Sequence, residues 1–491
     1  MMKKTIQALL TENGPMLSGE LAKAYEAANQ TTNAAARQAI SRARRPVQKN
    51  KLIPFQDRQV FVYLEQQFTG VRYWDSLLSA ISGHAKSTNA FIRAMMAQSG
   101  TMAKNALPAY TMSPANNLKG HKRFDVLLDK LRQSKLIDDY NDEYYRLTVG
   151  GAQGSPFNIA RTKAIELSKK MVLTDFFDLT RKTNMVSYDS GTFWSDFGHF
   201  RWGFTAPSYL QGLASWDAKK QAPIPGFILA DIVLQRQATT ADISFFVEKV
   251  CTIRSFKNIS NFVPTLLVYG LEPEAFQLLK KHNVAIAFLD RVFGDTYVQL
   301  LDDLIHVLTQ ATQMVLHNPK KIEKIFDALA KSDGRYNNIV GDMFELMVAE
   351  LYRSIGVGYL AVNKEASSAL TISGNPKEID VLAERGGTMI AVECKATRTQ
   401  IGIDFVNEWL TAKIPDIHKF LNTPHLYPNK EFEYQLWSIG GFTPEAEARL
   451  HDAESSAKRY KISHYDKDKM TAYAKANHAQ TFLSHMLKHF S

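Results

Sequence analysis

The sequence predicts a multidomain α/β protein, with small helix-and-hairpin units at the front and α/β sandwich domains behind them. Three observations support this fold class. The 491 residues, 45% of them hydrophobic and 22% charged, are enough for about three or four domains that each bury a core. Helical and strand patterns alternate from residue 151 onward, as in layered α/β folds. The two cysteines, Cys251 and Cys394, belong to no C-x-x-C pair, which argues against a disulfide framework or a structural zinc site.

Neither a membrane span nor a secretory signal is expected. The most apolar stretches, Phe262–Leu271 and Val284–Leu289, are far shorter than the about 20 residues that a transmembrane helix needs. The first apolar run is interrupted by Gln7 and then by Thr11, which does not fit a signal peptide. We therefore expect a cytoplasmic protein.

Positive charge is concentrated in the first third of the chain. The whole chain carries a net charge of +10, and residues 1–150 contain 21 Lys or Arg against 12 Asp or Glu. A local basic excess is typical of proteins that bind a polyanion such as nucleic acid. The alternative is an ordinary solvated surface, and charge alone does not separate the two.

Residues 1–66 follow the element order of a winged helix. Helices are predicted at 3–11, at 18–28 and from Thr32 to Pro46, which stops the third helix. Two strands are predicted next, at Lys51–Phe55 and Val60–Leu64. We expect this unit to be the first domain.

The third helix carries the residues that indicate DNA binding. Its polar residues, none of them acidic, are Arg37, Gln38, Ser41, Arg42, Arg44 and Arg45. A DNA major groove accepts one helix, on which Arg and Gln can contact base edges and phosphates. A winged helix that makes protein contacts is the alternative.

Residues 67–150 are predicted to form a second winged-helix-like domain. Helical patterns at 74–83, 87–100 and 121–135 precede a strand, turn and strand within 136–147. The predicted wing carries four acids, Asp138, Asp139, Asp142 and Glu143. Because carboxylates repel phosphate, packing or dimerisation is as good an expectation for this unit as DNA contact.

The candidate chemistry lies in a domain predicted at 316–491. A helix at 341–356 places Glu345 beside an apolar stripe, and two strands follow, at 376–384 and 388–397. Gly386 and Gly387 lie between the strands, and both can take the positive φ of a two-residue hairpin turn.

That turn fixes the pairing register. It places Asp380 opposite Glu393, where two carboxylates on one face need a cation to compensate them. Lys395 projects to the same face, whereas Val392, Cys394 and Ala396 alternate into an apolar layer. Converging acids suit Mg²⁺, and the lysine could orient or deprotonate a water molecule. A salt bridge on a solvated strand is the alternative.

These residues resemble the PD-(D/E)xK nucleases, the restriction-endonuclease-like superfamily, and most closely its branch of Mrr-related restriction enzymes. The similarity covers about residues 335–465 and rests on Glu345, on Ile379-Asp380 and on Glu393-Cys394-Lys395. It implies that Asp380 and Glu393 bind Mg²⁺, or Mn²⁺ in its place, with the Cys394 carbonyl as a further ligand. It also implies that Lys395 serves the attacking water and that Glu345 assists as a metal ligand or through the water. One departure is that no proline precedes Asp380.

The middle of the chain, 151–315, is predicted to be a degenerate copy of the same α/β domain. Residues 263–290 and 434–466 share a strand, a Gly, a Pro-Glu-Ala helix start and a second strand. The comparison sets Asp231 against Asp380 and Glu248 against Glu393, with both of the middle residues on strands. Chance similarity of two α/β segments is the alternative.

Together these features predict a cytoplasmic, Mg²⁺-dependent DNA endonuclease in restriction or antiviral defence. A homodimer is plausible, because one active centre per chain usually needs a second chain to cut a duplex. A repair or recombination nuclease is one alternative, and a DNA-binding regulator or scaffold with an inert nuclease fold is another.

Overall fold

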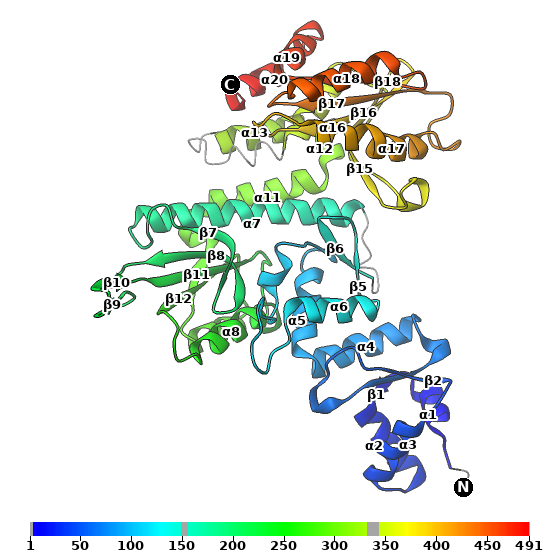
Figure 1. Cartoon of the computed structure of the whole chain (residues 1–491), viewed down its shortest axis with the longest axis vertical. Helices are drawn as coiled ribbons and strands as arrows, with labels where there is room; N and C mark the ends of the chain where they lie inside the picture. Colours follow the sequence, from blue (N-terminus) through cyan, green and yellow to red (C-terminus); the bar gives the residue numbers. More distant parts are fainter. Residues whose placement is uncertain (1–2, 149–155, 331–342, 491) are drawn as a thin grey trace. The chain divides into compact units, whose positions relative to one another are not determined.

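The chain forms two compact units of mixed α/β structure in a computed structural model (Figure 1). The structure describes residues 3–148, 156–330 and 343–490. The first unit comprises Met1–Gly154 and Val172–Asp295, and the second comprises Ser155–Met171 and Thr296–Ser491. Helix α7 (Pro156–Lys182) contributes to both. Within the described ranges, no helix has the length and apolar character needed to cross a membrane.

The first unit begins with three helices and a small antiparallel sheet, drawn in blue in Figure 1. The helices are α1 (Ile6–Asn13), α2 (Ser18–Asn29) and α3 (Asn33–Arg42). The strands are β1 (Met16–Leu17), β2 (Val47–Asn50) and β3 (Phe61–Leu64), in the order β1-β3-β2. Buried Leu10, Leu21, Ile40 and Val62 hold the helices against the sheet.

Two predicted boundaries in this region are wrong. The third helix ends at Arg42, so Arg44 and Arg45 lie beyond it; the chain leaves helical geometry at Ala43, whose ψ is 129°. Pro46 also disfavours helical geometry in Arg45, the residue directly before it. The next strand follows directly at Val47–Asn50, and the predicted strand at 51–55 is instead part of the connection to β3.

The next elements form a second small helical region with its own sheet. They are α4 (Val71–His84), α5 (Lys86–Met96), β4 (Thr101–Ala103), α6 (Phe124–Gln133), β5 (Ile137–Asp139) and β6 (Tyr144–Leu147). The sheet order is β4-β6-β5. Among the acids of the β5–β6 hairpin, Asp139 lies 2.7 Å from both Lys104 and Arg132. Its negative charge is therefore compensated within the unit.

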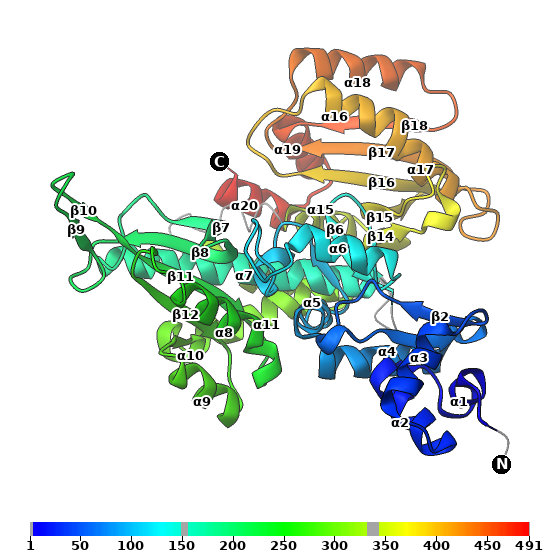
Figure 2. The same cartoon turned by 60° about the horizontal axis from the view of Figure 1, so that its bottom comes forward.

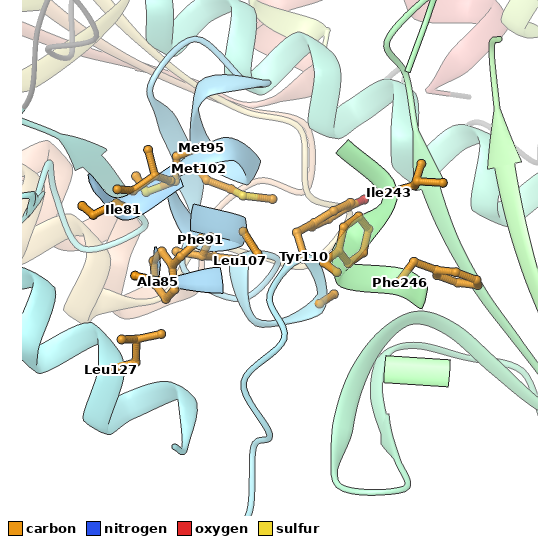
Figure 3. Close-up of a cluster of buried hydrophobic side chains, with 14 of the residues drawn as sticks. Ile81, Ala85, Phe91, Met95, Met102, Leu107, Tyr110, Leu127, Ile243 and Phe246 are labelled. Atoms are coloured by element: carbon orange, nitrogen blue, oxygen red, sulfur yellow. The ribbon is translucent and has the colours of Figure 1, made fainter. Parts of the chain in front are cut away.

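A continuous hydrophobic core joins this region to the middle of the chain. Figure 3 shows Phe91 and Leu107 in the same buried cluster as Tyr110 and the side chains of Ile243 and Phe246. The last two residues belong to α8 (Thr240–Arg254). Residues 71–147 and the middle sheet are thus stabilised by one core.

The middle sheet has five strands in the order β13-β12-β11-β8-β7. They are β7 (Thr192–Phe197), β8 (Phe200–Ser208), β11 (Gly226–Val233), β12 (Phe262–Val268) and β13 (Ala285–Phe288). A hairpin of β9 (Ser215–Asp217) and β10 (Ala222–Ile224) projects between β8 and β11, and α9 (Pro273–Lys281) joins β12 to β13.

The expectation that Glu248 lies on a strand is wrong, because residues 240–254 form α8. The Thr239 hydroxyl accepts the amide N–H of Asp242 and caps the helix. Ile243, Phe246 and Val250 are buried at helical spacing. Glu248 therefore has no place opposite Asp231.

Helices α10 (Leu289–Phe293), α11 (Asp295–Thr309), α12 (Ala311–His317) and α13 (Pro319–Ala330) precede the second sheet. That sheet has the order β14-β15-β16-β17-β18. Its strands are β14 (Tyr359–Ala366), β15 (Lys377–Arg385), β16 (Thr388–Lys395), β17 (Glu431–Ser438) and β18 (Lys461–Tyr465).

Helices cover both faces of the second sheet (Figure 2). Over one face lie α16 (Ile403–Glu408), a π-helical turn (Trp409–Lys413), α17 (Ile414–Leu421) and α18 (Pro444–Ser456). The other face packs Trp437 against Tyr352 of α15 (Phe344–Ser354) and Phe482 of α20 (Gln480–His489). Helix α19 (Lys467–Ala476) precedes α20.

The β15–β16 hairpin has the predicted register. Arg385 pairs with Thr388, and the pairing continues to Val381 opposite Val392. Gly386 and Gly387 have φ of 59° and 89°, the left-handed values that the tight turn requires.

The alternation predicted for β16 is correct only in part. Val392 is buried, but Cys394 and Ala396 are only partly buried and Glu393 is 5% exposed. The face of Glu393 is covered as well, because α16 and α17 pack over it.

Candidate active site

Asp380 and Glu393 lie at the end of the β15–β16 ladder. The last ladder pair is Val381 with Val392, one position before the two acids. Beyond that pair the Cys394 amide N–H donates to Asp380 Oδ2 at 2.7 Å. The hairpin thus holds the Asp380 carboxylate against the strand that carries Glu393. The contact of Cys394 seen here is through its amide, and the predicted role of its carbonyl stays a prediction.

Two lysines neutralise Glu393. Lys395 Nζ lies 2.9 Å from Glu393 Oε1, and Lys413 Nζ donates to Glu393 Oε2. Burial alone would raise the pKa of Glu393, but Lys413 and Lys395 hold that pKa below its usual value. Glu393 is therefore a buried carboxylate that stays ionised because it is doubly paired.

The other two predicted acids are much harder to ionise. Burial, together with the nearby Glu393 carboxylate, raises the pKa of Asp380 to about 6. Burial and the Asp380 carboxylate raise the pKa of Glu345, in the first turn of α15, to about 8. Asn363 Nδ2 donates to Glu345 Oε1 at 3.0 Å and orients that carboxyl group. Burial is the main cause of both elevated pKa values, and the neighbouring acid adds to each.

Sequence reasoning missed Lys413, Asn363 and the pair that Lys163 forms with Glu378. Lys163 of α7 is ion-paired with Glu378, two residues before Asp380 on β15. One signal could have revealed Lys413, because it follows the buried Trp409 and Leu410 at helical spacing. A lysine on the apolar face of an amphipathic helix needs a buried acid as its partner. Glu378 is thus ion-paired with Lys163, whereas Lys395 is ion-paired with Glu393.

The donors of this centre fit a hard divalent cation. Glu345, Asp380 and Glu393 all offer carboxylate oxygens, the ligands that Mg²⁺ and Mn²⁺ prefer. In the described part of the chain, these three acids do not gather their oxygens within 4.8 Å of one another. Both oxygens of Glu393 are instead directed to lysines.

A different cluster does bring three candidate ligands within 4.8 Å: Glu447 and His451 on α18, and His464 on β18. Both ring nitrogens of His464 already have partners. Nδ1 lies 2.7 Å from Glu454 Oε1, and Nε2 lies 2.6 Å from Lys469 Nζ. The Lys469 ammonium occupies the lone pair of His464 Nε2 that a metal ion would need. The cluster is therefore a hydrogen-bonded polar network rather than an open metal site.

The six predicted DNA-binding residues all lie on the surface. Arg37, Gln38, Ser41 and Arg42 are exposed on α3, while Ala36 and Ile40 are buried on its opposite face. Arg44 and Arg45 are exposed beyond the helix, and Arg45 lies 3.2 Å from Glu65. Lys49 Nζ donates to the Ser41 carbonyl at 2.8 Å. This lysine adds a positive charge beside the helix that sequence reasoning did not single out.

Comparison of the chain with protein-family models, curated proteins and solved structures gives no match.

Proposed function

We propose that the chain is a Mg²⁺-dependent endonuclease that hydrolyses phosphodiester bonds in DNA, with Mn²⁺ able to replace Mg²⁺. One observation carries the proposal: Asp380, Glu393 and Lys395 meet at the end of one hairpin, next to an acid on a preceding helix. This is the constellation that the resemblance to PD-(D/E)xK nucleases implies. The domain concerned is 316–491.

The ionisation of the centre supports cation binding. Two carboxyl groups have pKa values raised to about 6 and about 8 because they are buried near other acids. A divalent cation would favour their ionised forms and relieve the repulsion between them. The metal would polarise the scissile phosphate and stabilise its developing negative charge.

Lys395 is assigned to the attacking water. Although burial opposes it, Glu393 and Asp380 raise the pKa of Lys395, so the side chain stays an ammonium. It can donate a hydrogen bond that orients the water, and its charge can neutralise the pentacoordinate transition state. The Phe405 ring, 5.1 Å from Lys395 Nζ, restricts where the ammonium can move.

DNA delivery is assigned to residues 1–66 as a winged helix. The exposed face of α3 carries Arg37, Gln38, Ser41 and Arg42 and no acidic residue, which suits a major groove and its phosphates. We place the second winged-helix-like domain at 67–150 and the degenerate α/β domain at 151–315. A role in restriction or antiviral defence follows only by association with restriction enzymes.

The experiment is cleavage of supercoiled plasmid with Mg²⁺, with Mn²⁺ and with EDTA. Cleavage is expected with either metal and not with EDTA. Lys395→Ala should lower the rate about 100-fold or more, as for loss of a group that stabilises the transition state. Lys419→Ala is the control, because Lys419 Nζ donates to the Thr371 carbonyl on the same unit. Equal cleavage by the Lys395→Ala protein would contradict the proposal.

A DNA-binding scaffold with an inert nuclease fold is the second candidate. The observation that favours it is the double pairing of Glu393 with Lys395 and Lys413, which leaves neither carboxylate oxygen without a cation. Tight DNA binding by the intact protein, with no cleavage in either metal, would select this candidate.

A further inference from the structure

The two five-stranded sheets correspond strand by strand. Taken in chain order, the first three strands of each sheet pair antiparallel, and the last two strands of each sheet are added in parallel. Strands β8, β11 and β12 thus correspond to β15, β16 and β17. An isolated parallel bridge follows in both sheets, Ala238 with Leu271 and Ile401 with Phe442. The register of one sheet can therefore be compared directly with that of the other.

In that register Asp231 corresponds to Glu393, and not to Asp380 as the sequence comparison had set it. Strand β11 ends where Val233 pairs with Val268, and β16 ends where Lys395 pairs with Ser438. Two positions earlier, Asp231 pairs with Leu266 and Glu393 pairs with Leu436. The middle sheet therefore has a carboxylate in the position of Glu393 and a valine in that of Lys395.

Gly203 stands where the second sheet has Asp380. Ala230 pairs with Phe204, so the next position sets Gly203 against Asp231. The Gly203 amide N–H donates to Asp231 Oδ1 at 2.7 Å. A Cβ atom on Gly203 would lie 3.3 Å from that same oxygen, so this position leaves little room for a second acid.

A lysine on the following helix pairs with the acid in both sheets. Lys249 of α8 lies 2.6 Å from Asp231, as Lys413 pairs with Glu393. Counted along the chain from the bridge residue before each helix, Lys413 lies one residue further from Ile401 than Lys249 lies from Ala238. The π-helical turn Trp409–Lys413 explains the extra residue, because such turns accommodate a single insertion in an α-helix.

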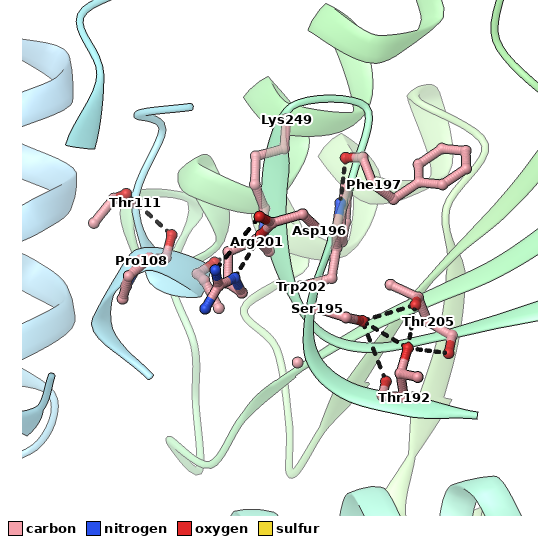
Figure 4. A network of polar contacts seen from close by, with 12 residues as sticks. Pro108, Thr111, Thr192, Ser195, Asp196, Phe197, Arg201, Trp202, Thr205 and Lys249 are labelled. Atoms are coloured by element: carbon pink, nitrogen blue, oxygen red, sulfur yellow. Dashed lines mark hydrogen bonds and ion pairs between the residues drawn. The ribbon is translucent and has the colours of Figure 1, made fainter. Parts of the chain in front are cut away.

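The two lysines differ in how firmly they are held. Lys249 is fully buried, and its ammonium donates to the carbonyls of Ala109 at 2.7 Å and Arg201 at 2.9 Å as well as to Asp231. Figure 4 shows it next to the Trp202 ring, whose centroid is 4.1 Å from Nζ. Three oxygens thus surround the ammonium nitrogen, much as oxygen ligands surround a metal ion. The Lys413 side chain is 22% exposed, and its described ion pair is with Glu393.

We propose that, in the metal-free protein, the Lys413 ammonium occupies the place of a divalent cation at Glu393 and that cation binding displaces it. Lys249 holds the same place in the middle sheet, where Gly203 stands at the position of Asp380 and Val233 at that of Lys395. Displacement in the second sheet leaves Lys395 on Glu393 to position the water. The inference rests on the proposed nuclease function.

The test is a titration of the full-length protein with Mn²⁺, with free ion counted by electron paramagnetic resonance. Lys413→Met should bind Mn²⁺ at least tenfold more tightly than the wild type, because no ion pair must be broken. Lys413→Arg should bind at least tenfold more weakly, because a guanidinium keeps the positive charge and offers more hydrogen-bond donors than an ammonium does. Lys419→Met is the matched control and should bind as the wild type does. Asp380→Asn identifies the site by losing the binding.

The outcomes separate the inference from the proposed function. Wild-type binding that Lys413→Met leaves unchanged or weakens would overturn the inference alone. Absence of Mn²⁺ binding from the folded wild-type protein would overturn both. Should Lys413→Met not fold, the Lys413→Arg titration decides, and affinity equal to that of the wild type counts against displacement.

Discussion

At the scale of single residues, the acids of the candidate site differ in pKa according to whether a lysine is paired with them. Glu393 stays ionised between two lysines, whereas burial and neighbouring acids raise the pKa of Asp380 to about 6 and that of Glu345 to about 8. The pKa values differ because the acids and lysines come from separate elements, and within the described part of the chain only Glu393 lies beside two of the lysines. Under the proposed function, a divalent cation would bind all three carboxyl groups in their ionised forms.

A further acid in the same sheet makes stability depend on pH. Burial, with the Glu378 carboxylate paired across the ladder, raises the pKa of Glu365 from 4.5 to about 7. The folded state therefore binds the proton more tightly than the unfolded state, so this group lowers stability as pH rises from about 4.5 to about 7. Glu365→Gln should remove that loss.

One pKa unit corresponds to about 1.4 kcal/mol, so the full shift would amount to about 3.5 kcal/mol. Solvent screening lowers this for a partly buried carboxyl group, and the expected gain from Glu365→Gln is roughly 2 kcal/mol at pH 8 and close to zero at pH 4. Thermal melting of both proteins at the two pH values measures it. Glu431→Gln is the control, because Glu431 is exposed at the start of β17. A gain of equal size at both pH values would show that the substitution acts through packing.

At the scale of elements, α3 combines a buried face with an exposed basic face. Ala36 and Ile40 fix the helix to its sheet, and Arg37 and Arg42 project to the solvent. Arg37→Ala with Arg42→Ala should weaken DNA binding equally on unrelated sequences if both contact phosphate. The slope of log affinity against log salt should then fall by about 1 to 2, because each phosphate contact releases about one counterion.

Fluorescence anisotropy of labelled duplexes at several salt concentrations measures both quantities. Lys219→Ala with Lys220→Ala removes the same charge from the exposed turn between β9 and β10 and serves as the control. If affinity and salt slope are the same for the α3 variant and the wild type, α3 is not the DNA-binding helix.

At the scale of the whole molecule, the described residues supply one proposed centre per chain. The middle sheet has the same topology but carries Gly203 and Val233 in place of an acid and a lysine. Under the proposed nuclease function, one centre would cut one strand at a time, and cleavage of both strands would call for a second chain.

This predicts that dilute protein nicks plasmid and that linear product rises steeply with protein concentration. Gel assays over a concentration series, together with light scattering on the DNA-free and DNA-bound protein, test the expectation. A constant ratio of linear to nicked product from a strictly monomeric protein would contradict the dimer.

The sequence by itself determined the features that depend on local chemistry. Gly386 and Gly387 defined a two-residue turn, and the turn defined the ladder from Arg385 to Val381, because side-chain alternation allows only one register for a given bend. The polar face of α3 and the mixed α/β class were readable for similar reasons, since amphipathic periodicity needs no knowledge of partners.

Only the tertiary structure decided which distant groups meet. Lys413 lies on a helix and Glu393 on a strand, and Lys249 reaches Asp231 from a segment that had looked like a strand. In that segment Ile243, Phe246 and Val250 are buried at helical spacing, whereas the sequence comparison had aligned the segment with a strand. Pairing across layers depends on how helices pack over sheets, and no local pattern in the chain specifies that.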